Sequence, residues 1–191
     1  AANYSFIYAQ GTVTITKRQL TITANDAHKT YGDTKTYLGT EFSVSGNVEG
    51  ETPGTARLAS SGDAPTASVG GGTNEDGTYP IAPSALSASA TFNPANYTIS
   101  YVNGKLIIDK APLAIRANSL TKTYGDVLTL NGVEFTSTSL KNGETITSVT
   151  LSADCANPTA SAGTCDVTPS LAIGGGTFSS GNYDITYSNG T

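Results

Sequence analysis

Residues 96–126 read NYTISYVNGKLIIDKAPLAIRANSLTKTYGD, and this stretch decides the fold because the chain contains it twice. The earlier copy, NYSFIYAQGTVTITKRQLTITANDAHKTYGD, occupies residues 3–33. The two copies align without a gap at an offset of 96 − 3 = 93 residues, and 15 of their 31 positions are identical. Self-similarity at a fixed period is typical of repeat architectures, so we expect tandem units.

Alternating side chains predict that the repeated stretch forms β-strands. Tyr97, Ile99 and Tyr101 alternate with threonine and serine, which indicates a strand with one buried face. Each such strand is followed by a pair of turn-forming residues, and Asn-Gly is the strongest short hairpin signal because both residues tolerate positive φ. We therefore predict that each unit ends in a β-hairpin. The predicted hairpin turns are Gln10-Gly11, Asn103-Gly104 and Asn189-Gly190.

The strand after each predicted turn runs directly into the next unit. Leu106 and Ile108 have even numbers, whereas Leu113 and Ile115 have odd numbers. A shift of one residue turns the apolar set to the opposite face. We therefore expect the chain to leave one core and enter the next near residues 110–112, and neighbouring units to sit end to end with restricted bending.

The repeat divides the chain into three parts. Residues 1–17 are predicted to be the terminal β-strands of a preceding repeat, residues 18–110 repeat domain 1, and residues 111–191 repeat domain 2 without its last strand. The predicted fold is all-β, with two tandem immunoglobulin-like β-sandwich domains in an elongated arrangement. β-grasp-like repeats are the alternative. The lack of any Met, even at position 1, predicts a fragment or a processed product, and the match between residues 180–191 and residues 1–12 leads us to expect a piece of a longer tandem array.

Composition favours an extracellular protein. The 10 Lys and Arg against 15 Asp and Glu give a formal charge of −5, so no basic patch for nucleic acid is expected. No apolar run reaches the length of a transmembrane segment. The surface rich in Thr, Ser and Gly, with Tyr as the main aromatic residue, fits a secreted or cell-surface β protein.

Two cysteines, Cys155 and Cys165, predict a local disulfide in an oxidising compartment. CxxC spacing is absent, and the one histidine leaves a zinc site short of ligands. Two buried free thiols are the alternative. The cysteines lie where the second copy is seven residues shorter than the first, since 182 − 96 = 86 and 93 − 86 = 7. We expect a disulfide-closed loop that stabilises the domain by about 2–3 kcal/mol.

The motif Lys-Thr-Tyr-Gly-Asp occurs at residues 29–33 and 122–126, and it suggests either acid–base chemistry or a turn. The only histidine, His28, has Thr121 as its counterpart, so a Ser-His-Asp arrangement cannot form twice. We predict a structural turn in which Gly supplies positive φ, Asp caps backbone amides and Tyr packs at the core edge. The predicted turn residues are Lys29, Tyr31, Gly32, Asp33, Lys122, Tyr124, Gly125 and Asp126. No catalytic residue is predicted.

Four residues of the first domain are secondary candidates for a calcium site: Asp63, Asn74, Glu75 and Asp76. They lack the alternating spacing and the distant bidentate glutamate of a calcium loop. We therefore expect a solvated loop and no cofactor, with Ca²⁺ as the minor alternative.

The ordered combination of Lys-Thr-Tyr-Gly-Asp, Tyr-Pro-Ile (79–81) and NYTISYVNGKLIIDKAPLAI (96–115) resembles the tandem MBG/YDG-type repeats of large secreted bacterial adhesins. These include filamentous-haemagglutinin-like exoproteins and biofilm matrix adhesins. The resemblance covers both domains. It implies a non-enzymatic stalk module that works in cell adhesion or biofilm and filament formation at the bacterial surface. Its partners would be neighbouring repeats. The pattern departs at 165–167, where Cys-Asp-Val replaces Tyr-Pro-Ile.

Other functions stay open at this point. The chain could be a glycan- or mucin-binding module, in which Tyr37 and Tyr79 are the freest candidates to stack on sugars. It could also be an accessory domain of a secreted polysaccharide-degrading enzyme. Finally, residues 11–17 copy the strand that repeat domain 2 lacks, so one molecule could complete another by β-strand addition. Frayed ends are the alternative.

Overall fold

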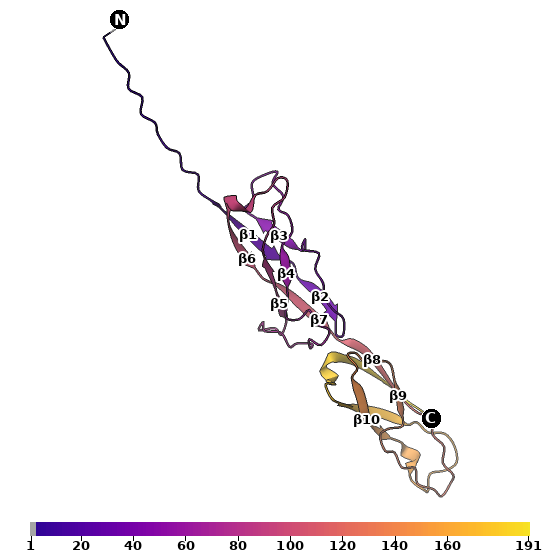
Figure 1. Cartoon of the computed structure of the whole chain (residues 1–191). Coiled ribbons are helices and arrows are strands. Elements are labelled where there is room, and N and C mark those ends of the chain that lie inside the picture. Colours follow the sequence, from indigo (N-terminus) through magenta and orange to yellow (C-terminus); the bar gives the residue numbers. More distant parts are fainter. Residues whose placement is uncertain (1–2) are drawn as a thin grey trace.

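The computed structural model describes residues 3–191, and its regular structure is almost entirely β (Figure 1). The only helical elements among these residues are the short 3-10 turns η1 (Pro94–Asn96), η2 (Asp154–Ala156) and η3 (Ser180–Asn182). The strands are β1 (Arg18–Ala24), β2 (Ala27–Thr30), β3 (Phe42–Ser45), β4 (Arg57–Ala59), β5 (Tyr79–Ser84), β6 (Tyr97–Val102), β7 (Gly104–Asp109), β8 (Ala111–Ala117), β9 (Phe135–Ser137), β10 (Thr145–Ser152), β11 (Thr168–Gly175) and β12 (Tyr183–Ser188). The predicted all-β class is confirmed. A β-grasp would need an α-helix packed on its sheet.

The first sandwich, unit 1 (residues 18–110), contains two sheets. Their strand orders are β3-β1-β6 and β2-β7-β5-β4. β1 runs parallel to β6, and β2 runs parallel to β7. Because side chains alternate along each strand, one set from each sheet points into the space between them. The best-buried side chains fall into two clusters, one with Leu20 and Ile22 and the other with Ile81 and Leu106.

The strands expected to form a hairpin do not pair with each other. β6 and β7 are consecutive but lie in different sheets, so the chain crosses the sandwich at Asn103-Gly104. A Cβ on Gly104 would lie 2.5 Å from the Ala24 carbonyl oxygen, so only glycine permits this crossing. Asn189-Gly190 makes the equivalent crossing, and Gln10-Gly11 lies outside any strand. The hairpin prediction was wrong because Asn103 and Gly104 do not adopt positive φ, and the chain passes from one sheet to the other without folding back.

The second sandwich, unit 2 (residues 111–191), repeats this plan with fewer strands. Its sheets are β12-β8-β9 and β10-β11. Gly190 pairs with Val167 in an isolated bridge, in the way that Gly104 pairs with Ile81 in unit 1. The described residues contain no counterpart of β7, and residues 120–123, the counterpart of β2, do not form a strand. The two observations belong together because the ladder partner of β2 is β7.

Residues 3–17 extend away from unit 1 and form no strand (Figure 1). We expected terminal strands over residues 1–17, of which Ala1 and Ala2 lie outside the described residues. The structure differs because the equivalent residues of the next repeat form β6 and β7 by pairing with β1, β2 and β5. No such partners lie beside residues 3–17.

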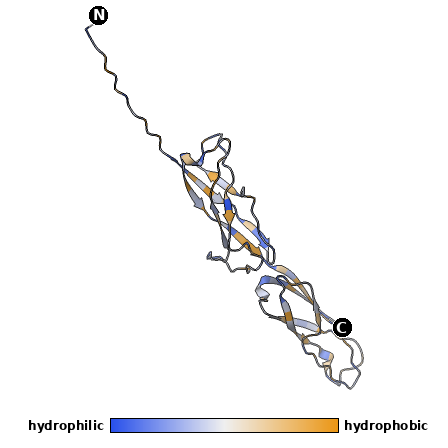
Figure 2. Cartoon of the chain, viewed as in Figure 1, coloured by the Kyte–Doolittle hydropathy of each residue, from blue (hydrophilic) through white to orange (hydrophobic). Residues whose placement is uncertain are grey.

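A single residue, Lys110, separates β7 of unit 1 from β8 of unit 2. Leu106 and Ile108 are buried in unit 1, whereas Leu113 and Ile115 are buried in unit 2, as the change of parity predicts. One hydrophobic cluster includes residues from both units. The units lie end to end, and hydrophobic residues follow the strands of both (Figures 1 and 2).

Candidate functional site at the junction of the two units

Three side chains from distant parts of the sequence meet at the junction of the units. Tyr31 comes from the turn after β2, Glu144 from the turn before β10, and Tyr183 from the start of β12. The Tyr31 hydroxyl donates to Glu144 Oε1 at 2.5 Å, and the Tyr183 hydroxyl donates to Glu144 Oε2 at 2.6 Å. The two rings form an edge-to-face pair with centroids 5.5 Å apart, a favoured aromatic geometry.

This Tyr–Glu–Tyr cluster is buried. Tyr31 is 3% exposed, Tyr183 2% and Glu144 8%. A buried carboxylate is costly unless donors surround it, and here each of its two oxygens accepts a hydrogen bond from a phenol. Tyr183 also accepts a hydrogen bond from the Lys141 amide at 2.9 Å and stacks on Phe178. The cluster therefore holds both units in one orientation.

The electrostatics of the cluster keep the phenols protonated. Burial, and then the hydrogen bond to Glu144, raise the pKa of Tyr31 above its usual value. The same two causes, in the same order, raise the pKa of Tyr183. A tyrosine that takes part in proton transfer near neutral pH would need the opposite shift. The arrangement therefore serves as a structural contact.

Gly32 lets the stem of Lys141 cross the turn of unit 1. It has a φ of +90°, and a Cβ there would lie 2.5 Å from Lys141 Cγ and Cδ. The Lys141 ammonium reaches Asp33 Oδ1 at 3.4 Å. Glycine thus meets two requirements at this position: a left-handed backbone and room for a side chain of the other unit.

Two further hydrogen bonds join the units. The Asn142 side chain donates to the Pro65 carbonyl at 3.1 Å, and the Val69 amide donates to Asn182 Oδ1 at 2.9 Å. Asn182 is 4% exposed. Together with the aromatic cluster and the β7–β8 connection, these bonds distribute the contact around the junction.

The three side chains proposed for acid–base chemistry have separate partners. Lys29 is buried, and its Nζ donates to the carbonyls of Asp33, at 3.0 Å, and Ala64. Burial lowers the pKa of Lys29, while the charges of Asp63 and Asp33 oppose this. Tyr31 points to unit 2. The carboxylate of Asp33 contacts Lys141, where we had expected it to cap backbone amides, and the amide of Asp33 closes the turn on Thr30 at 3.1 Å.

The second copy of the motif has the same internal geometry, but its tyrosine is exposed. Lys122 Nζ donates to the Asp126 carbonyl at 3.1 Å and to the Asn157 carbonyl at 2.5 Å, and Gly125 has a φ of +94°. Tyr124, however, is 70% exposed. The burial of Tyr31 therefore comes from the neighbouring unit and not from the turn itself.

One glutamate, at the equivalent position in each unit, has a structural role that was not predicted from the sequence. Glu41 accepts hydrogen bonds from the amides of Leu38, Gly39 and Thr40 at 2.8, 2.9 and 3.0 Å. These bonds, led by that from Leu38, hold the pKa of Glu41 below its usual value. Glu134 binds the amides of residues 131–133 in the same way. The available signal was the Glu-Phe pair at the same register in both copies.

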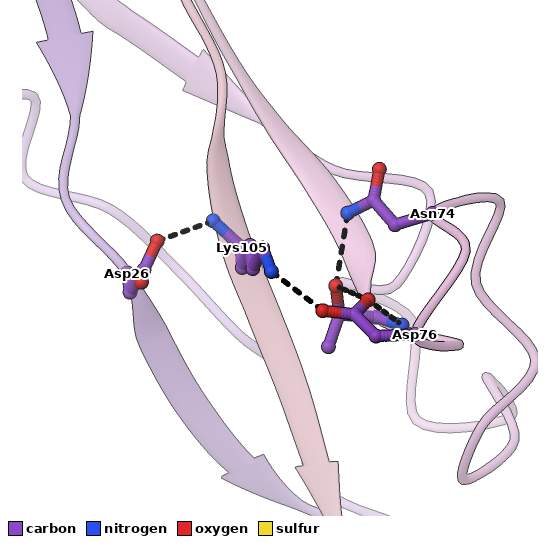
Figure 3. Close-up of polar contacts among 5 residues, drawn as sticks. Asp26, Asn74, Asp76 and Lys105 are labelled. Atoms are coloured by element: carbon purple, nitrogen blue, oxygen red, sulfur yellow. Dashed lines mark hydrogen bonds and ion pairs between the residues drawn. The ribbon is translucent and has the colours of Figure 1, made fainter.

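The proposed calcium ligands do not converge. Asp76 Oδ2 pairs with Lys105 Nζ at 2.5 Å, and Asn74 donates to the Thr78 hydroxyl at 2.9 Å (Figure 3). The Lys105 amide meanwhile binds Asp26 Oδ1 at 2.7 Å (Figure 3). The lysine, followed by Thr78, holds the pKa of Asp76 well below its usual range.

The two remaining candidate ligands lie apart from that pair. Asp63 accepts hydrogen bonds from Tyr37 and the Ser60 amide, and Glu75 is exposed. Over residues 3–191 no three His, Cys, Asp or Glu side chains are grouped so that they could hold a metal ion.

The two tyrosines considered for sugar stacking are engaged within unit 1. Tyr79 is 8% exposed, and its hydroxyl donates to the Ser68 carbonyl at 3.0 Å. Tyr37 is half-buried and donates to Asp63 at 3.0 Å, with Lys35 over its ring. Tyr79 thus lacks the open ring face that a sugar requires.

Cys155 and Cys165 form a disulfide, with Cα atoms 6.2 Å apart. The bond closes a loop at the far end of unit 2 and does not touch the junction. It stands where unit 1 has Tyr79 packed against Gly62, so the two units use different means to fix the same loop.

Comparison with known proteins gives one match. A family model described as MBG domain (YGX type) matches residues 20–107 and again residues 113–191. No curated protein and no solved structure matches the chain. No helix in the described part of the chain is long and apolar enough to cross a membrane.

Proposed function

We propose that this chain, which belongs to the MBG domain family of the YGX type, is a stalk module that keeps successive domains of an extracellular bacterial adhesin in a fixed line. MBG repeats are typical of extracellular proteins, and the family is not a catalytic one. The finer part of the proposal, a role in cell adhesion or biofilm formation at the bacterial surface, is supported by the family resemblance.

The junction carries the proposal. Domains in one chain usually move relative to each other unless their interface is large and hydrophobic. Here a single residue links β7 to β8, and the Tyr–Glu–Tyr cluster is buried between the units. Both features resist bending, which a spacer needs and an enzyme or a simple binding domain does not.

Small-angle X-ray scattering tests this spacer role. We expect the chain to scatter as one elongated particle, and Tyr31→Ala to broaden the distance distribution by loosening the junction. Tyr124→Ala is the matched control, because it removes the equivalent side chain where no unit covers it. All three proteins are measured at a low protein concentration, so that association between molecules does not change the distance distribution. A compact particle, or a wild-type chain as flexible as Tyr31→Ala, would contradict the proposal.

The two tyrosines considered for sugar stacking do not support glycan binding, since Tyr79 is buried and Tyr37 is hydrogen-bonded. We therefore expect this chain to give no signal on a mucin and matrix glycan array. A reproducible, saturable signal would make glycan binding the primary function. It would leave the rigidity of the junction untouched.

A further inference from the structure

Four asparagines of this chain are followed by glycine: Asn103, Asn131, Asn142 and Asn189. In an Asn-Gly pair the backbone nitrogen of the glycine can attack the carboxamide carbon of the asparagine, because glycine has no side chain to obstruct the approach. The reaction needs a glycine amide that is free of hydrogen bonds, open space around it, and an asparagine side chain that can turn toward it. The four pairs differ in these properties.

Three of the glycines are engaged in the fold. The Gly190 amide donates to the Val167 carbonyl at 3.0 Å, and the Gly132 amide donates to a carboxylate oxygen of Glu134 at 2.9 Å. Gly104 is enclosed by the main chain, because an added Cβ would lie 2.5 Å from a carbonyl oxygen. A nitrogen that attacks must first lose its proton, and a hydrogen bond from that amide opposes the loss.

Gly143 differs from these three glycines. Its amide has no acceptor in the part of the chain that the structure describes, residues 3–191, and a Cβ on it would meet nothing within 4 Å. Asn142 and Gly143 form an exposed turn before β10, with φ values of 52° and 71°. The Glu144 amide closes this turn on the Lys141 carbonyl at 2.9 Å. The attacking nitrogen of this pair is therefore open to water.

The side chain of Asn142 is held by unit 1. Its Nδ2 donates to the Pro65 carbonyl at 3.1 Å. It also acts on Tyr31: burial and then the bond to Glu144 raise the pKa of this phenol, and the Asn142 side chain opposes them. Docking of the units thus restrains the carboxamide that must turn toward Gly143, and opening of the junction releases it.

We propose that Asn142-Gly143 is a site of spontaneous deamidation, which reacts when the junction opens and then weakens its closure. The Gly143 nitrogen loses its proton and bonds to Cγ of Asn142, the bond from Cγ to the carboxamide nitrogen breaks, and ammonia leaves. Water then opens the cyclic imide and gives aspartate or isoaspartate. The net change replaces an NH2 group by a carboxylate oxygen, with water as the only co-reactant.

An aspartate at this position removes a contact between the units. A carboxylate only accepts hydrogen bonds, so it cannot donate to the Pro65 carbonyl as Asn142 does. The turn itself tolerates an acidic residue, because Glu49 stands there in unit 1, since 142 − 93 = 49. The Glu51 amide closes that turn on the Val48 carbonyl at 3.1 Å. The loss therefore falls on the junction and not on the fold of unit 2.

Isoaspartate acts on the Tyr–Glu–Tyr cluster as well. It lengthens the main chain by one carbon–carbon bond, about 1.5 Å, two residues before Glu144. The two oxygens of Glu144 accept hydrogen bonds from Tyr31 and Tyr183 at 2.5 and 2.6 Å. A displacement of that size exceeds what hydrogen-bond geometry permits, so the cluster cannot close as before.

Peptide mass spectrometry of the chain during incubation at pH 8 tests the site. We expect Asn142 to react before Asn103, Asn131 and Asn189. Tyr31→Ala should speed the reaction at Asn142 alone by at least about tenfold, because it releases the docked side chain. Tyr124→Ala is the matched control and should leave the rate unchanged, since Tyr124 is exposed.

The possible results separate this inference from the spacer role. A faster reaction at another Asn-Gly pair would overturn the deamidation site. If Asn142 reacts first but Tyr31→Ala does not speed it, control by the junction is overturned. That second result would agree only with a wild-type chain whose junction is already flexible, which contradicts the spacer role and leaves the site itself intact.

Hydrogen exchange at the Val69 amide tests the effect on the junction, because this amide donates to Asn182 of unit 2 at 2.9 Å. We expect Asn142→Asp, which is the direct product, to speed this exchange by about tenfold. Asn131→Asp makes the same chemical change at a pair whose side-chain contact lies within unit 2, and it should leave Val69 unchanged. Unchanged exchange in Asn142→Asp, or equal acceleration in both variants, would overturn the proposal.

Discussion

Glu144 links the two units through a single buried carboxylate. Both of its oxygens accept hydrogen bonds from phenols, one from unit 1 and one from unit 2. Tyr31 and Tyr183 are 113 and 39 positions away from Glu144 in the sequence, so a local pattern predicts neither contact. The sequence could identify Tyr31 as a turn residue, but its partner depends on how the next unit docks.

Replacing Tyr31 with phenylalanine isolates the hydrogen bond between the units. We expect Tyr31→Phe to lower the free energy of unfolding by about 1–2 kcal/mol, because one oxygen of a buried carboxylate loses its donor. Urea denaturation followed by circular dichroism measures the change. Tyr124→Phe should change the free energy of unfolding little, since Tyr124 is exposed. Equal losses in the two variants would show that the turn, and not the junction, is responsible.

Alanine at the two motif glycines separates backbone strain from contact between units. Both glycines have positive φ, so each substitution should cost about 1–2 kcal/mol from strain alone. Gly32→Ala should cost more than Gly125→Ala, because only its Cβ would collide with Lys141. Thermal unfolding of the two variants in parallel gives the difference. A larger loss at Gly125 would contradict the account of the junction.

The raised pKa of Tyr31 predicts how the junction responds to alkali. A folded state that holds the phenol proton more tightly is fully stabilised below the usual tyrosine pKa of about 10, and loses this stabilisation as pH rises through the higher folded-state pKa. The stability difference between the wild-type chain and Tyr31→Phe should therefore shrink above about pH 10. Denaturation midpoints from pH 8 to 12 test this. A difference that grows with pH would reverse the assigned direction.

At the level of elements, β7 and β8 show what the pattern could and could not predict. The alternation of apolar and polar residues predicted the strands. The change of parity around Lys110 correctly predicted that the chain passes from the core of unit 1 to the core of unit 2. The predicted partner of β6 was wrong. Asn103-Gly104 predicts a local hairpin with the next strand, whereas β6 pairs with the distant β1. Strand order depends on long-range contacts that a local turn signal does not contain.

The disulfide between Cys155 and Cys165 is expected to stabilise unit 2 and not unit 1. Replacing Cys155 and Cys165 with serine should lower the free energy of unfolding of unit 2 by about 2–3 kcal/mol, because the unfolded loop gains conformational entropy. Unit 1 should be unaffected, because the loop lies away from the junction. Hydrogen exchange resolved by unit measures both effects. Faster exchange throughout unit 1 would show that the bond stabilises the whole chain.

At the level of the molecule, the two units lie end to end and share one hydrophobic cluster (Figure 1). Tyr31 is buried by unit 2, whereas the equivalent Tyr124 is exposed, and in unit 1 Tyr97 donates to Glu51 as Tyr183 donates to Glu144 in unit 2. The sequence could predict tandem units and restricted bending. It could not predict that Tyr31, Glu144 and Tyr183 meet at the junction, because these residues are far apart in sequence and come together only in the folded chain.

The central claim is that the two units form one rigid body through this junction, and residual dipolar couplings measured by NMR test it most directly. We predict that couplings from unit 1 and unit 2 of the wild-type chain fit a single alignment tensor. Tyr31→Ala should require two tensors of different magnitude, while Tyr124→Ala should still fit one. Separate tensors for the two units of the wild-type chain would contradict the account.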